Sequence, residues 1–440
     1  MIHTVARRNA LYERLPKKAC VLVFGASHVR RNGENSHLYR QSSDLLFLTG
    51  ITEPDVIAVF TPSKTARFTV LCRPRDREAE IWFGPRMGLE GAVQRIGADA
   101  AFELGERDRR LFELLDGCDE VHYLIGETPE HDALVARTIA RLRRNERNGS
   151  RAPSRIVDLD QTLHELRCRK DDHGIACLRK SCAVTIEGQA LAAAATVAGK
   201  RECEIAALVE YAFRRQNGVP GFSSIVAAGE NATHLHYVTG EACLQAGQLL
   251  LVDVGCEIAG FTGDVTRTYP VPAPGSRPAF SAKQQALYEA VLAAQLAGIA
   301  AVKPGSTVEA IHNTISLTLA TELRALALLE EDPLMAVQLG HLLRFYPHRS
   351  SHFLGMDVHD VGRYFPGDKP RPLEPGHVIT IEPGLYIQPD DPKHDWRGLA
   401  VRIEDDVLVT TEGCEVLTSA LPKQPAELLK LVSQGVTFHG

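Results

Sequence analysis

The chain has 440 residues, of which 44% are hydrophobic and 24% are charged, so it is a globular protein too long for one ordinary core. Its formal net charge of −6 gives no reason to expect nucleic acid or an acidic membrane as a partner. Its ten cysteines are scattered without a CxxC pair, which argues against a structural zinc site or a disulfide framework and is typical of free thiols in a reducing cytoplasm. Residues 1–19 lack the apolar core of a secretory signal, and the longest apolar helix pattern, 290–302, is too short to span a bilayer. We therefore expect a cytoplasmic protein.

The first part of the chain alternates predicted strands and helices. Short β-rich runs occupy 20–24, 56–60 and 68–72, and helical spacing marks 111–115 and 132–144. The run NGSRAPS at 148–154 indicates a loop, and the basic cluster at 137–151 is typical of a solvated helix end. We expect an α/β domain over 1–168 and a second domain over 169–440.

The second domain shows long helical patterns separated from β-rich runs, which predicts an α+β arrangement. The predicted helices cover 170–199, 202–217, 281–302 and 306–329. Ser306 and Glu309 have the spacing of a capping box at the start of the last of these helices. The predicted strands cover 248–258, 265–271, 377–387 and 401–410.

Two aspartates flank a predicted hairpin turn. The apolar stretches of 249–270 surround the turn Ile258-Ala259-Gly260, and the midpoint of positions 253 and 264 falls within it. Symmetric pairing would place Asp253 opposite Asp264, with Cβ atoms roughly 5 Å apart. Two buried carboxylates so close repel each other unless a cation lies between them.

Two glutamates repeat this pattern further along the chain. Glu382 precedes Pro383 and Gly384, which predicts a strand end or bulge that aims its side chain. Glu404 lies on a strand-like run, where alternation places it on the same face as Arg402.

A histidine cluster supplies a fifth candidate ligand. His348, His352 and His359 all lie in the segment HRSSHFLGMDVHDVG. A single aspartate on a hairpin is more often a turn or edge residue than a ligand. Four strand carboxylates beside a histidine cluster instead favour a site for a pair of Mn²⁺, Fe²⁺, Co²⁺ or Zn²⁺ ions.

These segments resemble the pita-bread metallopeptidase family, and within it the bacterial aminopeptidase P branch. The matching stretches are GENATHLHY, VDVGCEIAGFTGDVTRTYP, SSHFLGMDVHDVG, ITIEPGLYI and RIEDDV, in that order. In the first domain, YRQSSDLLFLTGITEP and EIWFGPRMG resemble the domain that precedes the catalytic unit in aminopeptidase P and prolidase. The resemblance implies an α/β amino-terminal domain and a pita-bread catalytic domain.

The resemblance also implies a peptidase with two metal ions, usually manganese, with Co²⁺ or Zn²⁺ as alternatives. Such an enzyme removes the first residue of a peptide whose second residue is proline. By similarity, Asp253 holds one metal, while Asp264 and Glu404 bridge both. His352 and Glu382 complete the shell of the second metal.

Further roles come from the resemblance alone. Glu382 would move protons, His236 and His359 would contact the substrate or the tetrahedral intermediate, and His348, Tyr386 and Arg402 would line the pocket. Imidazoles in such positions can donate hydrogen bonds to a developing oxyanion. The segment departs from the family at Arg349 and Ser350, where many relatives have small or apolar residues.

Several alternatives remain open from the sequence. Prolidase, a dipeptidase, shares the two-domain plan and the five ligands, whereas methionine aminopeptidase lacks the long first domain. Metal-free enzymes and binding modules of this fold have lost ligands that this chain keeps. Trp82 is expected to pack in the core or, by family resemblance, to reach a neighbouring subunit's active site. By analogy, we expect a homodimer or homotetramer.

Overall fold

The computed structural model describes residues 2–392 and 394–435. The chain divides into two compact units, 1–167 and 168–440, and each is described here by itself. The predicted boundary after residue 168 lies one residue beyond this division. Among the described residues, no helix is both long and apolar enough to cross a bilayer.

The amino-terminal unit is built on a mixed six-stranded sheet in the order β6-β5-β4-β1-β7-β8. These strands are β1 (Ala19–Phe24), β4 (Ile57–Phe60), β5 (Phe68–Cys72), β6 (Ala100–Glu103), β7 (Glu120–Tyr123) and β8 (Arg155–Asp158), and a separate ribbon joins β2 (Arg30–Asn32) to β3 (Asn35–Ser36). The helices are α1 (Ile2–Arg14), α2 (Ser43–Thr49), α3 (Arg77–Phe83), α4 (Gly88–Gln94), α5 (Arg107–Leu115), α6 (Pro129–Arg144) and α7 (Leu163–Cys168). Strand β1 pairs antiparallel with β4 and parallel with β7, and its apolar run lies in the core. This is the expected α/β domain.

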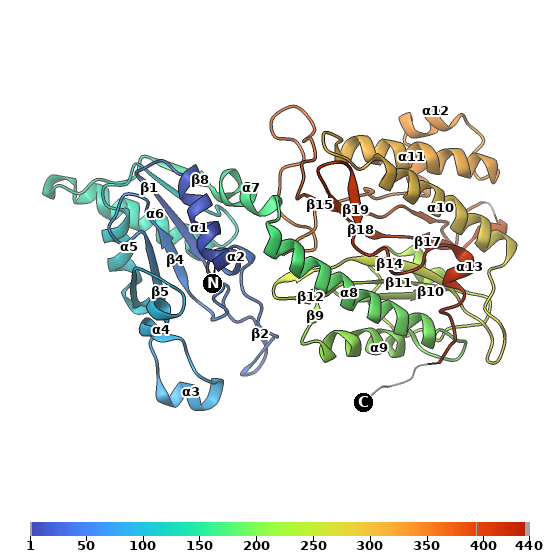
Figure 1. The fold of residues 1–440 in the computed structure, drawn as a ribbon, viewed down its shortest axis with the longest axis horizontal. Coiled ribbons are helices and arrows are strands. Elements are labelled where there is room, and N and C mark those ends of the chain that lie inside the picture. The colour runs from blue at the N-terminus through green and yellow to red at the C-terminus, as the bar shows by residue number, and fades with distance from the viewer. Residues whose placement is uncertain (1, 393, 436–440) are drawn as a thin grey trace. The chain divides into compact units, whose positions relative to one another are not determined.

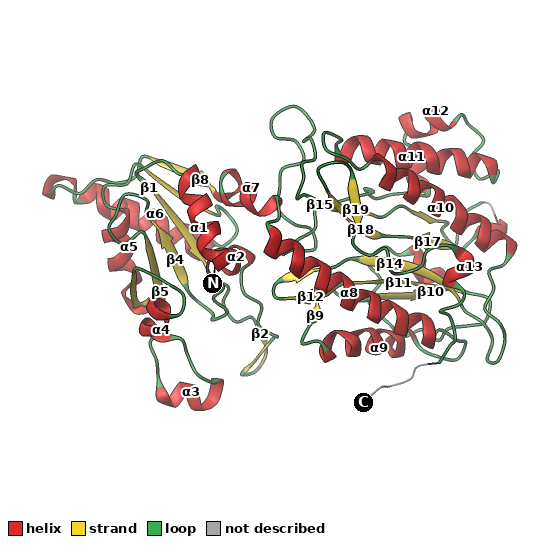
Figure 2. Cartoon of the chain, viewed as in Figure 1, coloured by secondary structure: helices red, strands yellow, loops and turns green. Residues whose placement is uncertain are grey.

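The carboxy-terminal unit places short antiparallel strands between two pairs of helices (Figures 1 and 2). One pair is α8 (Asp172–Ala195) with α9 (Glu202–Arg215), and the other is α10 (Ala282–Ala301) with α11 (Val308–Ala325). The strands are β9 (Val219–Pro220), β10 (Ile225–Ala228), β11 (Leu249–Val254), β12 (Cys256–Ile258), β13 (Phe261–Thr262), β14 (Val265–Pro270), β15 (Val378–Ile381), β16 (Gly384–Tyr386), β17 (Ala400–Arg402), β18 (Asp405–Val409) and β19 (Cys414–Val416). Two short helices, α12 (Pro333–Gln338) and α13 (Pro425–Leu428), complete it. The separation of helices and strands agrees with the expected α+β domain.

The hairpin register differs from the symmetric pairing predicted from the sequence. Asp253 lies opposite Thr266, and the turn consists of Ala259 and Gly260 between the paired residues Ile258 and Phe261. Both turn residues have positive φ, 53° and 79°, as a two-residue type I′ turn requires. The prediction that Asp253 faces Asp264 directly is therefore wrong by two positions.

The predicted capping box at the start of α11 is also wrong. Thr307 caps the helix by accepting a hydrogen bond from Ala310 N at 3.0 Å. Ser306 instead folds back, where its Oγ accepts from Lys303 N at 3.1 Å. Glu309 is thus not used in capping, and its side chain is available for another contact.

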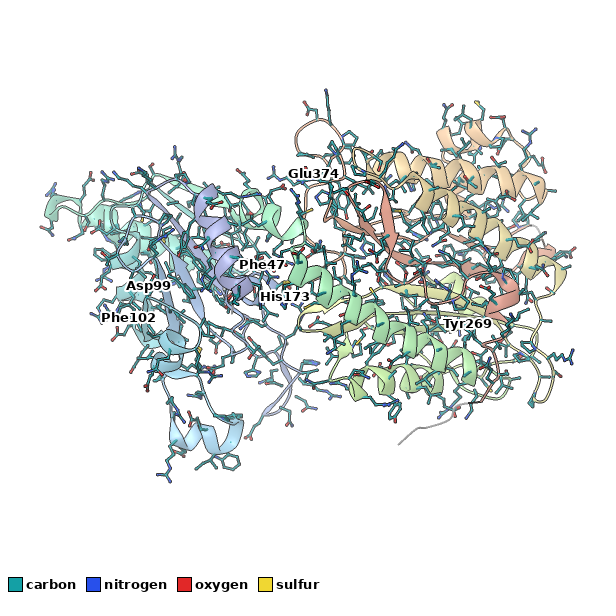
Figure 3. The ribbon with its side chains drawn as sticks, in the orientation of Figure 1. Phe47, Asp99, Phe102, His173, Tyr269 and Glu374 are labelled. Carbon is teal, nitrogen blue, oxygen red and sulfur yellow. The ribbon has the colours of Figure 1, made fainter. Side chains whose placement is uncertain are left out.

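A buried glutamine on α8 ties this helix to the strands that carry the two aspartates. The Gln189 side-chain amide donates to the carbonyls of Val252 and Val265, at 3.0 and 2.7 Å. Its Oε1 accepts from the Tyr269 hydroxyl at 2.8 Å, and Tyr269 lies inside the unit in Figure 3. The polar groups of this buried side chain are therefore paired, which fixes β11 and β14 against α8.

Candidate active site

A cavity of about 1150 Å³ lies in the carboxy-terminal unit. The predicted site residues that line it are His236, Asp253, Asp264, His348, His352, His359, Glu382, Arg402 and Glu404. Tyr386 is buried and hydrogen-bonds to two of these residues. The fold thus gathers the predicted residues around one hollow.

Each candidate carboxylate lies near the end of a strand. Asp253 is the fifth residue of β11, and Asp264 immediately precedes β14, on the other arm of the hairpin. Since Asp253 pairs with Thr266, Asp264 is its diagonal neighbour on the same sheet face. Glu382 follows the end of β15, and Glu404 lies between β17 and β18.

Three of the candidates converge closely enough to share one cation. Ligand atoms of Asp264, His352 and Glu404 all lie within 4.8 Å of one another. His352 Nε2 is 3.4 Å from Asp264 Oδ2 and 3.6 Å from Glu382 Oε1. Asp253 is held at the edge of the group by Arg402, whose Nη2 donates to Asp253 Oδ2 at 2.6 Å.

The hydrogen bonding of His352 leaves one ring nitrogen directed at the carboxylates. Its Nδ1 lies 3.1 Å from the Phe353 carbonyl, which can only accept, so Nδ1 carries a proton. In the neutral ring, the Nε2 lone pair then faces the oxygens of Asp264 and Glu382. This tautomer is the one that an Nε2 metal ligand requires.

Burial and crowding strongly disfavour the ionised carboxylates when no cation is present. Burial, followed by the charges of neighbouring carboxylates, raises the pKa of Asp264 and of Glu404 well above the usual values. Burial raises the pKa of Glu382 to about 7, although His352 and Arg402 oppose the shift. Neutralisation by divalent cations would remove this cost.

The donor set fits divalent metal ions. Asp253 Oδ1 is buried and has no hydrogen-bond partner among the described residues, while Oδ2 is occupied by Arg402. An orphaned carboxylate oxygen beside other carboxylates and one imidazole is a hard, oxygen-rich set suited to Mn²⁺, Co²⁺ or Zn²⁺. The donor atoms that converge in the cavity therefore fit a divalent metal ion.

A chain of hydrogen bonds next to the carboxylates determines which group donates each proton. Burial and then Arg402 lower the pKa of His348 to about 3, so its ring is neutral. Its Nδ1 donates to the Arg349 carbonyl at 2.8 Å, so Nε2 accepts from the Tyr386 hydroxyl at 2.9 Å. The Tyr386 oxygen accepts in turn from Arg402 Nη1 at 2.8 Å. His348 and Tyr386 thereby hold the guanidinium that binds Asp253.

Two further histidines complete the cavity wall. The ring of His359 lies edge-on to that of His352, with centroids 4.4 Å apart. Burial, with the nearby His352 and His236 charges, lowers the pKa of His359, which favours a neutral ring. His236 lines the cavity from the loop between β10 and β11.

Sequence reasoning missed two residues that support the carboxylates. Thr266 donates to Glu404 Oε2 at 2.7 Å and accepts from Arg402 Nε at 3.1 Å. Its position two residues after Asp264 on the same strand face could have identified it. Asp406 is fully buried and accepts from the Asp264 amide at 3.0 Å, and the acidic run Glu404-Asp405-Asp406 was its signal.

Trp82 does not lie in the core. It is 77% exposed at the end of α3, between Ile81 and Phe83, which are 77% and 84% exposed. The core interpretation of this residue is therefore wrong, because the short helix turns its apolar end to solvent.

Two segments of the chain match known protein families. Residues 176–411 match metallopeptidase family M24, and residues 4–123 match the aminopeptidase P amino-terminal domain. The Xaa-Pro aminopeptidase of Escherichia coli is 35% identical over 97% of this chain and 96% of its own length.

Solved structures give the same result over the whole chain. The aminopeptidase PepP of Pseudomonas aeruginosa superposes with a TM-score of 0.94 at 38% identity, covering 98% of this chain and 97% of that one. Zinc-substituted E. coli aminopeptidase P in complex with product superposes with a TM-score of 0.93 at 34% identity, with the same coverage. These similarities confirm the family expected from the sequence and its two-domain α/β and α+β plan. The chain belongs to metallopeptidase family M24 and is a metallo-aminopeptidase.

Proposed function

We propose that this protein binds two divalent metal ions and releases the first residue of peptides whose second residue is proline. Asp253, Asp264, His352, Glu382 and Glu404 are the proposed ligands. The observation that carries the proposal is the convergence of buried carboxylates with a correctly oriented imidazole in one cavity. The similarity to Xaa-Pro aminopeptidases over nearly the full chain supports the substrate class.

When bound, the metal ions would polarise the scissile carbonyl and lower the pKa of water. Glu382 lines the cavity, with its Oε1 3.6 Å from His352 Nε2, and a carboxyl group in this position can accept and donate a proton. We assign it the transfer of a proton toward the leaving nitrogen. We assign to His236 and His359, which line the cavity, the donation of hydrogen bonds to the oxygen of the attacked carbonyl.

The remaining pocket residues position the ligands. Arg402 neutralises part of the charge on Asp253, and Tyr386 and His348 hold Arg402 in place. We propose Mn²⁺ as the metal, with Co²⁺ or Zn²⁺ as alternatives that the same hard donor set can bind. By family resemblance, we also propose that the protein is cytoplasmic and forms a dimer or tetramer. The exposed apolar residues at the end of α3 could take part in this self-association.

The test is hydrolysis of Ala-Pro, Ala-Pro-Ala-Ala and Ala-Ala-Ala-Ala, with Mn²⁺ and with a chelator. We expect chelator-sensitive release of the first alanine from Ala-Pro-Ala-Ala, with much slower cleavage of the peptide without proline. Cleavage confined to Ala-Pro would identify a prolidase-type dipeptidase instead. Metal-independent cleavage, or none, would contradict the proposed chemistry.

A further inference from the structure

A charged pair forms part of the cavity wall apart from the candidate metal ligands. The guanidinium of Arg349 contacts the carboxylate of Glu309, and both residues line the cavity. Their side chains are 55% and 34% exposed, so a molecule in the cavity can reach either one.

The backbone around Arg349 is anchored although its side chain is exposed. The Arg349 carbonyl accepts from His348 Nδ1 at 2.8 Å. The next residue, Ser350, is fully buried, and its Oγ lies 2.7 Å from His312 Nδ1 and 2.5 Å from the Tyr346 hydroxyl. The guanidinium is therefore presented from a fixed stretch of chain.

Glu309 is placed by the first turn of α11. Because Thr307 caps this helix, the Glu309 carboxylate is not needed at the helix end and turns to Arg349. The two residues are 40 positions apart in the chain and meet only in the folded unit.

Among the described residues that line the cavity, Arg349 is the arginine whose side chain is partly exposed. The other arginine among the described lining residues, Arg402, is buried and already bonded to Asp253, Tyr386 and Thr266. Among the described lining residues, Glu309 is likewise the carboxylate that lies outside the candidate metal ligands. Within this described lining, Arg349 is therefore the guanidinium that an anionic group of a substrate can reach.

We propose that Arg349 binds a carboxylate of the peptide substrate and that Glu309 competes for the same guanidinium. This inference rests on the proposed peptidase function. A guanidinium pairs with a carboxylate through two parallel hydrogen bonds, so it selects this group over a neutral amide. The carboxylate is the free carboxy terminus of a short peptide or an acidic side chain that follows the proline.

The experiment measures kcat/KM for two matched peptide pairs with Mn²⁺. One pair is Ala-Pro-Ala and its carboxy-terminal amide, and the other is Ala-Pro-Glu amide and Ala-Pro-Gln amide. For each enzyme, kcat/KM for the charged peptide is divided by kcat/KM for the neutral peptide. This ratio is not affected by a general loss of activity. The enzymes are the wild type, Arg349→Gln, Glu309→Gln and the control Arg179→Gln, whose arginine forms a comparably exposed pair with Glu415.

In the wild type we expect a ratio of about five for at least one pair, because a half-exposed guanidinium is screened by water. Arg349→Gln should bring that ratio close to one, Glu309→Gln should raise it severalfold, and Arg179→Gln should leave it unchanged. A response of the first pair alone identifies the terminal carboxylate as the ligand, and a response of the second identifies the acidic side chain.

Equal ratios in the wild type and in Arg349→Gln, for both pairs, would overturn the inference. A ratio that responds equally to Arg179→Gln would overturn it too. Failure of the wild type to cleave either neutral amide with Mn²⁺ would instead count against the peptidase proposal itself.

Discussion

Asp264 is held through both its side chain and its backbone within the proposed metal centre. Its carboxylate lies 3.4 Å from His352 Nε2, and its amide is held by Asp406. Asp264→Ala or Glu404→Ala should lower kcat/KM by about a thousandfold or more, since either change removes several kcal/mol of transition-state stabilisation supplied through a shared metal. The measurement is peptide hydrolysis in buffer of controlled Mn²⁺ concentration.

The matched control for this test is Glu415→Gln. Glu415 is a half-exposed carboxylate of the same unit, paired with Arg179 away from the cavity. Its removal should leave kcat/KM within about twofold, since exposed ion pairs contribute little. Wild-type turnover in Asp264→Ala or Glu404→Ala would contradict the two-metal assignment.

For single residues, the sequence identifies charged side chains that lie unexpectedly within apolar strands. Asp253 and Glu404 stand out because an isolated buried charge is costly. The pair of Arg349 and Glu309 cannot be foreseen in this way. Each residue is ordinary for its local surroundings, and only the folded chain brings them together.

The loop between β10 and β11 is anchored to α9 by a buried carboxylate. Glu202 accepts hydrogen bonds from Ala228 N at 2.8 Å, Asn231 Nδ2 at 3.0 Å, the Tyr237 hydroxyl at 3.0 Å and Ala242 N at 3.1 Å. These donors bracket His236, so Glu202 is a positioning residue for it.

Glu202→Gln replaces an acceptor of four hydrogen bonds with a group that must also donate. We expect the free energy of unfolding to fall by about 2 kcal/mol and kcat/KM to fall about tenfold, because His236 is no longer held. Bound metal, measured by elemental analysis, should not change. Glu204→Gln, at a more exposed position on the same helix, is the control. Lower stability with unaltered kinetics would show that the loop does not position His236.

In the amino-terminal unit, α2 and α7 are joined by a buried ion cluster. Asp44 Oδ1 accepts from Arg167 Nη1 at 2.7 Å, and Asp44 Oδ2 lies 3.0 Å from His164 Nε2. Burial opposes ionisation of Asp44, but Arg167 and His164 outweigh it and lower the pKa to about 2. A lowered pKa stabilises the folded state above the unfolded pKa, and this stabilisation is lost as the pH falls toward 2.

Asp44→Asn should therefore destabilise this unit at pH 7 by about 3 kcal/mol, because Arg167 and His164 lose the buried carboxylate that they contact. The difference from the wild type should shrink as the pH falls from 4 to 2. Hydrogen exchange of peptides from residues 1–167 measures both effects. Asp108→Asn, which breaks an exposed pair with Arg137, is the control. A destabilisation that does not vary with pH would refute the electrostatic explanation.

Periodicity predicts the existence of the strands well, but it does not fix their register. The hairpin of β11 and β14 is set by a type I′ turn at Ala259 and Gly260. Alanine rarely takes positive φ, so the predicted turn Ile258-Ala259-Gly260 was located correctly but its two central residues could not be identified. A shift of two positions leaves Asp253 and Asp264 on the same sheet face. The prediction that both side chains belong to one site therefore does not depend on the exact register.

For the whole molecule, metal binding should stabilise one unit selectively. The proposed ligands all belong to the carboxy-terminal unit, and the amino-terminal unit has its own sheet and core. Mn²⁺ at a hundred times its dissociation constant should add about 2.7 kcal/mol to the unfolding free energy of the carboxy-terminal unit.

Calorimetry of chelator-treated protein, with and without added Mn²⁺, measures this effect. The transition of the carboxy-terminal unit should move to higher temperature, while hydrogen exchange of residues 1–167 stays constant. The same addition to Asp264→Ala should produce a much smaller shift. An equal shift in that variant would place the metal elsewhere.

The bonds that enclose the cavity join stretches far apart along the chain. Arg402 reaches Asp253 over 149 positions, Asp406 binds the Asp264 amide over 142, and Arg267 pairs with Asp405 over 138. During translation, the hairpin of β11 and β14 therefore leaves the ribosome before β17 and β18. Until then, its two aspartates lack their partners from those strands. All the proposed ligands can enclose a cation only after Glu404 and Asp406 have also been made, so we expect loading of the proposed metal site to follow folding of both parts of the carboxy-terminal unit.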